Sequence, residues 1–397
     1  MPAVPSIRSI VQGAALGLAL TAVAGCGGIE PGEGEASLRA ALASASACNY
    51  ERVHFTIESV QVHESPLASA SALGWRILKL PTPRRVDLME LDNGVLEELG
   101  ETSLPVGRYQ QLRLVLEPNT AAQPLRNSVV TAAQGEVALE MPAAQHGGLV
   151  MRIDRRVDDQ ERLDFVLDLD ACASIVPRSA SGGYLLNPIV GILPRPVGDG
   201  LSIAGRLDNL PAEGAVVSLQ QAGRVLRSTR TDADGRFVLS PAPGGNHDLV
   251  IVAEGRASAM LTNVPVTAAG RSQVTMGDQP IGLVASAMRT VSGRITLLGT
   301  SAIPQAQASA LQTVGTRVVE IGTRPTDAVD GSYTLRLPVQ PPMLASYQAN
   351  AASHDFVPDI GHAANYSIEA AVPGRAAQTI AVEIGLADAV ANFDFTP

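Results

Sequence analysis

Aromatic and charged residues are both scarce in this chain. Only 3% of its 397 residues are Phe, Trp or Tyr, and only 17% are charged. So few aromatics leave little material for the stacking surfaces that bind bases or sugars. The formal net charge is −10, and no cluster of Lys and Arg offers phosphates a basic face. These absences argue against nucleic acid and stacked sugars as partners.

Catalytic signatures are missing as well. The sequence has no G-x-S-x-G elbow, no H-E-x-x-H, no Walker loop and no G-x-G-x-x-G that opens a helix. The His/Asp cluster of His354-Asp355, Asp359 and His362 falls in a Gly/Ala-rich stretch, where we expect solvated loop side chains. We therefore interpret the chain as non-enzymatic. A cavity that gathers His54 or His354 with carboxylates would favour an enzyme instead.

Apolar, Gly and Pro residues are abundant. The chain is 46% hydrophobic and contains 37 Gly and 27 Pro. This balance, rich in Val, Leu, Ala and Thr, favours short strands separated by many turns. The length allows two or three domains, and we expect an all-β protein of tandem β-sandwich domains.

Residues 1–25 have the pattern of a secretory signal. Arg8 precedes an apolar run from Ile10 to Ala24, and small residues lead up to Cys26. A run of about fifteen residues is short for a membrane span, which needs roughly twenty. The alternative is an ordinary signal peptide with a cysteine nearby by chance.

The sequence Ala24-Gly25-Cys26 resembles the lipobox of bacterial lipoproteins. The resemblance implies cleavage before Cys26, diacylglycerol on its thiol and acylation of the new amino group. Two or three acyl chains anchor a protein stably, so the membrane is the first expected partner. Gly27 stands where an Asp would retain a Gram-negative lipoprotein in the inner membrane. We expect an outer-membrane location in the cell envelope.

Residues 26–47 follow the signal and are rich in Gly, Ala, Ser and Glu. They are typical of a flexible tether, with a helical turn near Leu38–Leu42. Beyond the tether, Cys48 and Cys172 remain unassigned. In an oxidising compartment two cysteines favour a disulfide, which would stabilise the fold by about 4–5 kcal/mol. Two buried free thiols are the alternative.

Residues 48–196 are expected to form the first domain. Alternation with period two predicts strands at 53–63 and 163–170, and shorter patterns predict strands at 75–78, 86–94 and 109–116. His54 and His63 have opposite parity, so we expect them on opposite faces of one strand. The Asn93-Gly94 step predicts a turn.

Several segments of this domain resemble a family of domains of unknown function found in exported bacterial lipoproteins. They are Asp87-Leu88, Leu91, Asn93-Gly94, Leu99-Gly100, Leu104–Leu114, Leu167–Val176 and Tyr184–Pro188. The resemblance implies a β-sandwich-like module and no known reaction. Asp164, Asp168 and Asp170 fit the solvated face of its last strand. A Ca²⁺ site is the alternative, although the Gly turn and distal Glu of a calcium loop are missing.

The second half of the chain is a repeat, with copies at 200–279 and 285–397. Gly205-Arg206 and Thr231-Asp232 to Phe237 in the first copy match Gly293-Arg294 and Thr326-Asp327 to Tyr333 in the second. Both copies resemble carboxypeptidase regulatory-like (transthyretin-like) β-sandwich modules. The first copy is the closer match, and the second is divergent, with a longer ending that prolines interrupt and whose strand order the resemblance does not give. That resemblance implies a spacer, adhesive or binding role. Asp232 and Asp234 flank a turn, for which a weak Ca²⁺ site is the alternative.

The sequence thus predicts a non-enzymatic, lipid-anchored envelope protein with a structural, scaffolding or binding role. No cofactor is required, and the expected partner beyond the membrane is an unknown envelope protein or surface ligand. The alternative function is a Ca²⁺-dependent or ligand-binding adhesive surface protein.

Overall fold

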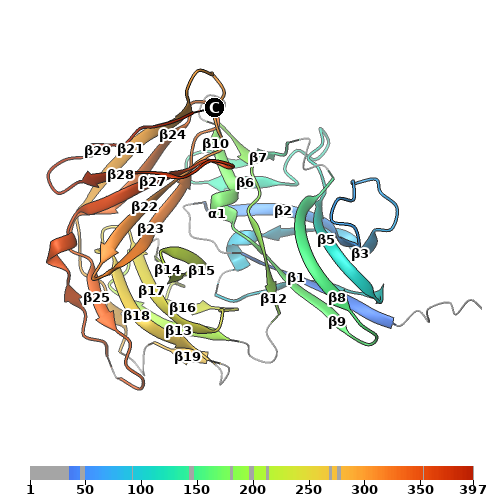
Figure 1. The fold of residues 1–397 in the computed structure, drawn as a ribbon, viewed down its shortest axis with the longest axis horizontal. Coiled ribbons are helices and arrows are strands. Elements are labelled where there is room, and N and C mark those ends of the chain that lie inside the picture. The colour runs from blue at the N-terminus through green and yellow to red at the C-terminus, as the bar shows by residue number, and fades with distance from the viewer. Residues whose placement is uncertain are drawn as a thin grey trace, which may run out of the picture. The chain divides into compact units, whose positions relative to one another are not determined.

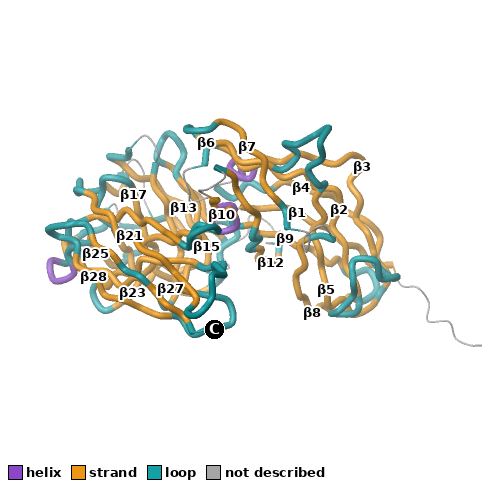
Figure 2. Tube along the Cα trace, turned by 90° about the horizontal axis from the view of Figure 1, so that it is seen from above, coloured by secondary structure: helices purple, strands orange, loops and turns teal. Residues whose placement is uncertain are grey.

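The computed structural model describes residues 35–44, 50–91, 93–142, 147–178, 182–195, 201–211, 214–267, 271–274, 279–351 and 353–396. Strands make up most of these segments, and the helical segments are short (Figures 1 and 2). The expected all-β class with tandem β-sandwiches is confirmed. The signal peptide, Cys26 and Cys48 lie outside the described residues. Within the described ones, no helix is long and apolar enough to span a membrane.

The first domain contains two sheets that enclose one hydrophobic core. One sheet has the order β12-β9-β1-β4, and the other β10-β11-β7-β6-β2-β5-β8, with β3 also paired to β2. The strands are β1 (Glu35–Ser44), β2 (Arg52–His63), β3 (Arg76–Asp87), β4 (Glu97–Pro105), β5 (Gly107–Leu116), β6 (Ser128–Thr131), β7 (Gly135–Glu140), β8 (Leu149–Val157), β9 (Arg162–Leu169), β10 (Ile175–Arg178), β11 (Gly183–Leu186) and β12 (Val190–Pro194). Phe55 and Tyr109 are the largest side chains buried between them.

β1 corrects the expectation of a tether over residues 26–47. Residues 35–44 form a strand, without the expected helical turn, between β4 and β9 in the middle of a sheet. Leu38, Ala40 and Leu42 are fully buried at a spacing of two. The Ala-rich composition suggested a helix or a linker, but pairing on both sides and core burial decide for a strand. The first domain therefore begins before residue 48.

A β-bulge in β2 corrects the predicted placement of His54 and His63. The pairing register shifts between Ile57 and Ser59 against both neighbouring strands. Core positions are odd-numbered up to Ile57 and even-numbered from Val60 onward. An extra residue in a strand reverses the facing of everything that follows it. Both histidines therefore lie on the outer face, nine residues apart.

The expected strand over 86–94 is also revised. β3 ends at Asp87, and a 3₁₀ turn, η1 (Leu88–Leu91), follows it. The turn at Asn93-Gly94 is confirmed, because both residues have positive φ, +57° and +79°.

The second half consists of two sandwiches with the same topology. The first has sheets β16-β13-β19 (with β20 on β13) and β15-β14-β17-β18; the second has β24-β21-β29 (with β30 on β21) and β23-β22-β27-β28. The strands are β13 (Ser202–Asp208), β14 (Ala215–Gln221), β15 (Arg224–Arg230), β16 (Arg236–Leu239), β17 (Gly245–Ala253), β18 (Ala259–Val266), β19 (Arg271–Gln273), β20 (Ile281–Gly282), β21 (Met288–Leu297), β22 (Gln307–Val314), β23 (Arg317–Pro325), β24 (Ser332–Pro338), β27 (Asn365–Ala371), β28 (Gln378–Glu383), β29 (Ala389–Val390) and β30 (Phe393–Phe395). Each strand pair of the first copy has its counterpart in the second, as the sequence repeat predicted.

A glycine beneath an aromatic ring recurs in both copies. Gly205 is the register partner of Phe237, and Gly293 is the register partner of Tyr333. A Cβ atom at Gly205 would lie 2.7 Å from the Phe237 ring, and one at Gly293 only 1.8 Å from the carbonyl oxygen of Ala391. In each copy, a side chain at this glycine would collide with the core aromatic residue and, at Gly293, also with the backbone of Ala391.

We expect Gly293→Ala to lower the free energy of unfolding by about 1–3 kcal/mol or more, because the added methyl group has no room. Gly322→Ala is the matched control, since a Cβ there meets nothing within 4 Å. Urea unfolding of both variants measures the difference. Equal stability of the two variants would contradict the steric argument.

A segment of the second copy completes the sheet of the first. Between β24 and β27 the chain forms β25 (Met343–Ser346) and β26 (Val357–Pro358), followed by η3 (Ile360–His362). β25 pairs in parallel with β18 of the preceding sandwich, as Figure 1 shows. The expected domain of 285–397 therefore contributes two strands to its neighbour, and the two sandwiches share a six-stranded sheet.

Substitution of Ala345 tests this shared sheet. Ala345 is buried in the core of the first copy, whereas the next residue, Ser346, is exposed. Ala345→Asp should lower the free energy of unfolding by about 3–5 kcal/mol, because it buries an unpaired charge, while Ser346→Asp should leave it nearly unchanged. Chemical denaturation of both variants decides, and a harmless Ala345→Asp would refute the pairing.

Candidate functional sites

Asp164 and Asp168 lie on one face of β9, and each is engaged by an arginine. Asp164 accepts a hydrogen bond from Arg195 Nε at 2.7 Å. Asp168 forms an ion pair with Arg227, whose side chain is only 3% exposed. The two carboxylate side chains are only 20% and 16% exposed. The sequence predicted a solvated face for this strand, and the structure shows a covered one instead.

Asp170 performs a third role at the end of the same segment. It is the N-cap of α1 (Ala171–Ser174) and accepts a hydrogen bond from the Ala173 amide at 2.8 Å. Burial raises the pKa of this carboxyl group to about 6, against the effect of the Ala173 hydrogen bond. The three aspartates thus have separate partners.

Asp170→Asn should change the pH dependence of stability. A carboxyl group whose pKa is raised on folding stabilises the protein below its unfolded pKa of about 3.9, and that contribution is lost as the pH rises through 6. Asn is neutral and caps equally well. Relative to wild type, the variant should therefore gain about 2–3 kcal/mol between about pH 4 and pH 7. Urea unfolding at both pH values measures this, and a pH-independent difference would contradict it.

Asp232 and Asp234 build a turn of the first repeat copy. Asp232 Oδ1 accepts hydrogen bonds from the amides of Asp234 (2.9 Å) and Arg236 (2.8 Å), while Asp234 pairs with the Arg236 guanidinium. The equivalent Asp327 accepts from the Val329 amide at 2.8 Å. These carboxylates serve their own backbone. Across the part of the chain that the structure describes, no group of three or more His, Cys, Asp and Glu could hold a metal ion.

Cys172 lies in α1 and is disulfide-bonded. Its expected partner, Cys48, falls outside the described residues, so the pairing between the two stays a prediction. The same holds for lipidation at Cys26.

A Ser/His/Asp group in the first domain escaped the sequence analysis. His54 Nδ1 lies 3.4 Å from Ser128 Oγ, and His54 Nε2 lies 4.0 Å from Asp87 Oδ2. The three residues come from β2, β6 and the end of β3, so no sequence motif links them. Only the pairing of these strands brings them together.

The hydrogen bonds of this group run in the wrong direction for nucleophilic catalysis. Ser128 donates its hydroxyl proton to Glu136 Oε1 at 2.6 Å and is fully buried, so His54 cannot act as its base. Asp87 accepts from the amides of Val53 and Met89 at 3.2 and 3.0 Å. Burial, together with Arg85, lowers the pKa of His54. The group is a structural network that ties β2 to its neighbours.

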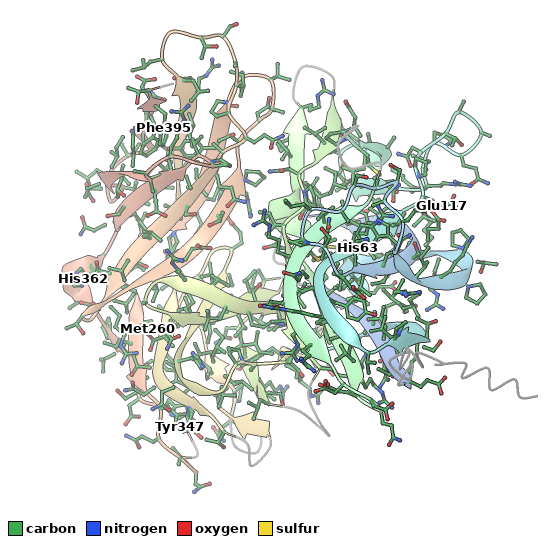
Figure 3. All side chains as sticks on the ribbon, turned by 45° about the vertical axis from the view of Figure 1, so that its right-hand side comes forward. His63, Glu117, Met260, Tyr347, His362 and Phe395 are labelled. Atoms are coloured by element: carbon green, nitrogen blue, oxygen red, sulfur yellow. The ribbon has the colours of Figure 1, made fainter. Side chains whose placement is uncertain are left out.

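His354 and His362, the histidines of the sequence cluster, have separate environments. His362 also lies in a different domain from His63, as Figure 3 shows. His362 Nδ1 lies 2.7 Å from Asp359 Oδ2, which also accepts from the Gly315 amide. His354 Nε2 donates to the Val274 carbonyl at 2.9 Å. His354 and His362 therefore have different partners.

A polar pocket of about 450 Å³ lies where the two repeat copies meet. Its lining includes His247, Asp248 and Arg317. His247 donates through Nε2 to the Pro243 carbonyl at 2.9 Å, and its buried Nδ1 has no hydrogen-bond partner among the described residues. Arg317 pairs with Asp248 and donates to Asn263 Oδ1 at 2.8 Å. Burial raises the pKa of Asp248 against the opposing effect of Arg317.

Two family models match the chain. Residues 35–188 match a domain of unknown function (DUF4382), and residues 203–277 match the carboxypeptidase regulatory-like domain. These matches confirm the family resemblances of the first domain and of the first repeat copy, and the first match begins at β1. The resemblance of the second copy and the lipobox stay predictions. No curated protein matches the chain.

Among solved structures, the Bacillus anthracis TIE protein is similar at 9% identity, with a TM-score of 0.18, over 92% of this chain and 50% of that one. The chain thus spans half the length of that protein. A streptococcal ancillary pilin (8%, TM-score 0.18) and the Corynebacterium diphtheriae major pilin SpaA (9%, TM-score 0.19) are each covered over 99% of their length, by 91% of this chain. Similarity at this level carries no conclusion about fold or function.

Proposed function

We propose that the protein is a non-enzymatic lipoprotein of the bacterial cell envelope, anchored through Cys26, with a scaffolding or binding role. The observation that carries the structural role is the parallel pairing of β18 with β25. It joins two sandwiches by backbone hydrogen bonds within one sheet. A rigid spacer on a membrane needs such a joint between its domains, because domains connected only by flexible linkers move relative to one another.

The charged side chains support the same proposal. The candidate carboxylates form ion pairs with arginines, cap a helix or close turns. The Ser/His/Asp group has a buried hydroxyl that donates away from the histidine. A catalytic centre needs an accessible nucleophile or base, and these groups offer neither.

Lipid anchoring is tested by metabolic labelling of the full chain with radioactive palmitate in a Gram-negative host. We expect label in wild type and Cys48→Ser and none in Cys26→Ser, which should leave the membrane fraction because the acyl chains are lost. Fractionation should place the labelled protein in the outer membrane. Unlabelled wild type, or label retained in Cys26→Ser, would refute the anchor.

A ligand-binding adhesive protein is the second candidate, favoured by the polar pocket at His247 and Arg317. In a thermal-shift screen, this candidate predicts a rise in Tm with Ca²⁺ or with a small anion, and loss of the anion response in Arg317→Gln. No response to any ligand would leave the scaffold as the sole proposal.

A further inference from the structure

The loop between β2 and β3, residues 64–75, is fastened to the outer face of its own sheet. His63 Nε2 donates to the Leu73 carbonyl at 2.9 Å, and the Trp75 indole donates to the Ser69 carbonyl at 3.0 Å. Gln111 donates to the Ala68 carbonyl at 3.3 Å. Backbone carbonyls along the loop are therefore held by side chains of β2 and β5 and by Trp75 of the loop itself, and the loop has a defined conformation.

Arg113 is the centre of this fastening. It is 7% exposed, donates twice to Gln61 Oε1 at 2.9 and 2.6 Å, and donates to the Ala70 carbonyl at 3.1 Å. Its guanidinium lies 3.9 Å from the centre of the Trp75 ring. Burial lowers the pKa of Arg113. A buried cation is costly for a fold, and here it orders one surface loop.

This ordered loop presents leucines to solvent instead of covering them. Leu67 is 78% exposed and Leu73 is 95% exposed. Because side-chain hydrogen bonds hold this loop in one conformation, the exposure of these leucines is a fixed feature of the fold and not a result of loop motion. Contiguous exposed apolar side chains mark contact surfaces.

Two further apolar residues flank the loop on the same face. Ile77, Gln61, Arg113 and Val150 are successive register partners across β3, β2, β5 and β8. Directly opposite residues share a face of the sheet, and Ile77 and Val150 are 48% and 58% exposed. The outer apolar patch thus consists of Leu67, Leu73, Ile77 and Val150. Lys79 and Arg152, both exposed, lie on β3 and β8 two residues along from Ile77 and Val150.

The patch lies near the point where the described chain begins. Glu35 is the register partner of Pro105. Two residues later, a Cβ atom at Gly107 would lie 3.3 Å from the Glu64 carboxylate at the base of the loop. Arg113 is six residues farther along β5, about 20 Å away. Figure 1 draws the start of β1 and the β2–β3 loop at the same margin of the first domain. Nine residue steps separate Glu35 from Cys26, a reach of at most about 30 Å.

We propose that the outer apolar patch rests on the bilayer that carries the lipid anchor, with Leu67 and Leu73 inserted between headgroups and Lys79 and Arg152 against lipid phosphates. This inference rests on the proposed anchoring at Cys26. A reach of at most about 30 Å allows the patch to touch that membrane, and this second contact would fix the orientation of the first domain on it. Apolar side chains of proteins that lie on a membrane surface insert about 5–10 Å into the boundary between headgroups and acyl chains.

Trp75 is the only tryptophan of the chain and lies in the fastened loop, so it reports on the contact directly. The processed full-length protein is reconstituted into vesicles of phosphatidylethanolamine and phosphatidylglycerol, with and without phospholipid brominated near the headgroup end of its chains. Flotation with the vesicles measures anchoring, and the loss of Trp75 emission in brominated vesicles measures contact. Leu67→Asp/Leu73→Asp removes the apolar contact, and Leu386→Asp, at an equally exposed leucine (90%) of the last sandwich, is the control.

We expect wild type and Leu386→Asp to float and to lose Trp75 emission in brominated vesicles. The double variant should float but keep its emission, with unchanged emission in plain vesicles showing that the loop is intact. Floating wild-type protein without quenching, or equal quenching in the double variant, overturns the inference. Failure of wild type to float overturns the anchor instead. A dimer in detergent that the double variant abolishes would assign the patch to a second copy and also overturn it.

Discussion

The parallel pairing of β18 with β25 is the interaction on which the arrangement of the last two sandwiches depends. In the third sandwich the equivalent of β18 is β28, which ends its sheet. Without β25, β18 would likewise present unpaired backbone groups, the kind of edge that invites aggregation. The insertion between β24 and β27 covers that edge, and its strand β26, which carries Pro358, is the last strand of the shared sheet. A proline on the last strand cannot extend the ladder, so the shared sheet stops there.

Some of the ion pairs connect different sandwiches. Arg227 on β15 reaches Asp168 on β9, Arg317 on β23 reaches Asp248 on β17, and Arg336 on β24 reaches Glu254. Each pair joins segments of different sandwiches. The candidate aspartates are instead bound to backbone amides or to arginines. These partners support the proposed scaffold role.

Much of the fold could be predicted from local pattern. Alternation identified β2 and β9, and a shorter pattern identified β5. The Gly-Arg and Asp-turn signatures identified the repeat, because each depends on residues close in sequence. β1 was missed because its Ala-rich sequence becomes a strand only between β4 and β9. The shared face of His54 and His63 was missed because one bulge reverses the parity of β2. The exchange of β25 and the meeting of His54 with Ser128 depend on pairing between distant strands, which no local pattern encodes.

Hydrogen exchange of the full chain, read by mass spectrometry, tests the shared sheet most directly. If β25 is a strand of the preceding sandwich, the amides of residues 343–346 should be protected to the same degree as those of 259–266, and both segments should open in one step as denaturant is added. Fast exchange of 343–346 beside a protected β18 would show that β25 is a loop. The two sandwiches would then be separate modules, and the proposed joint would not exist.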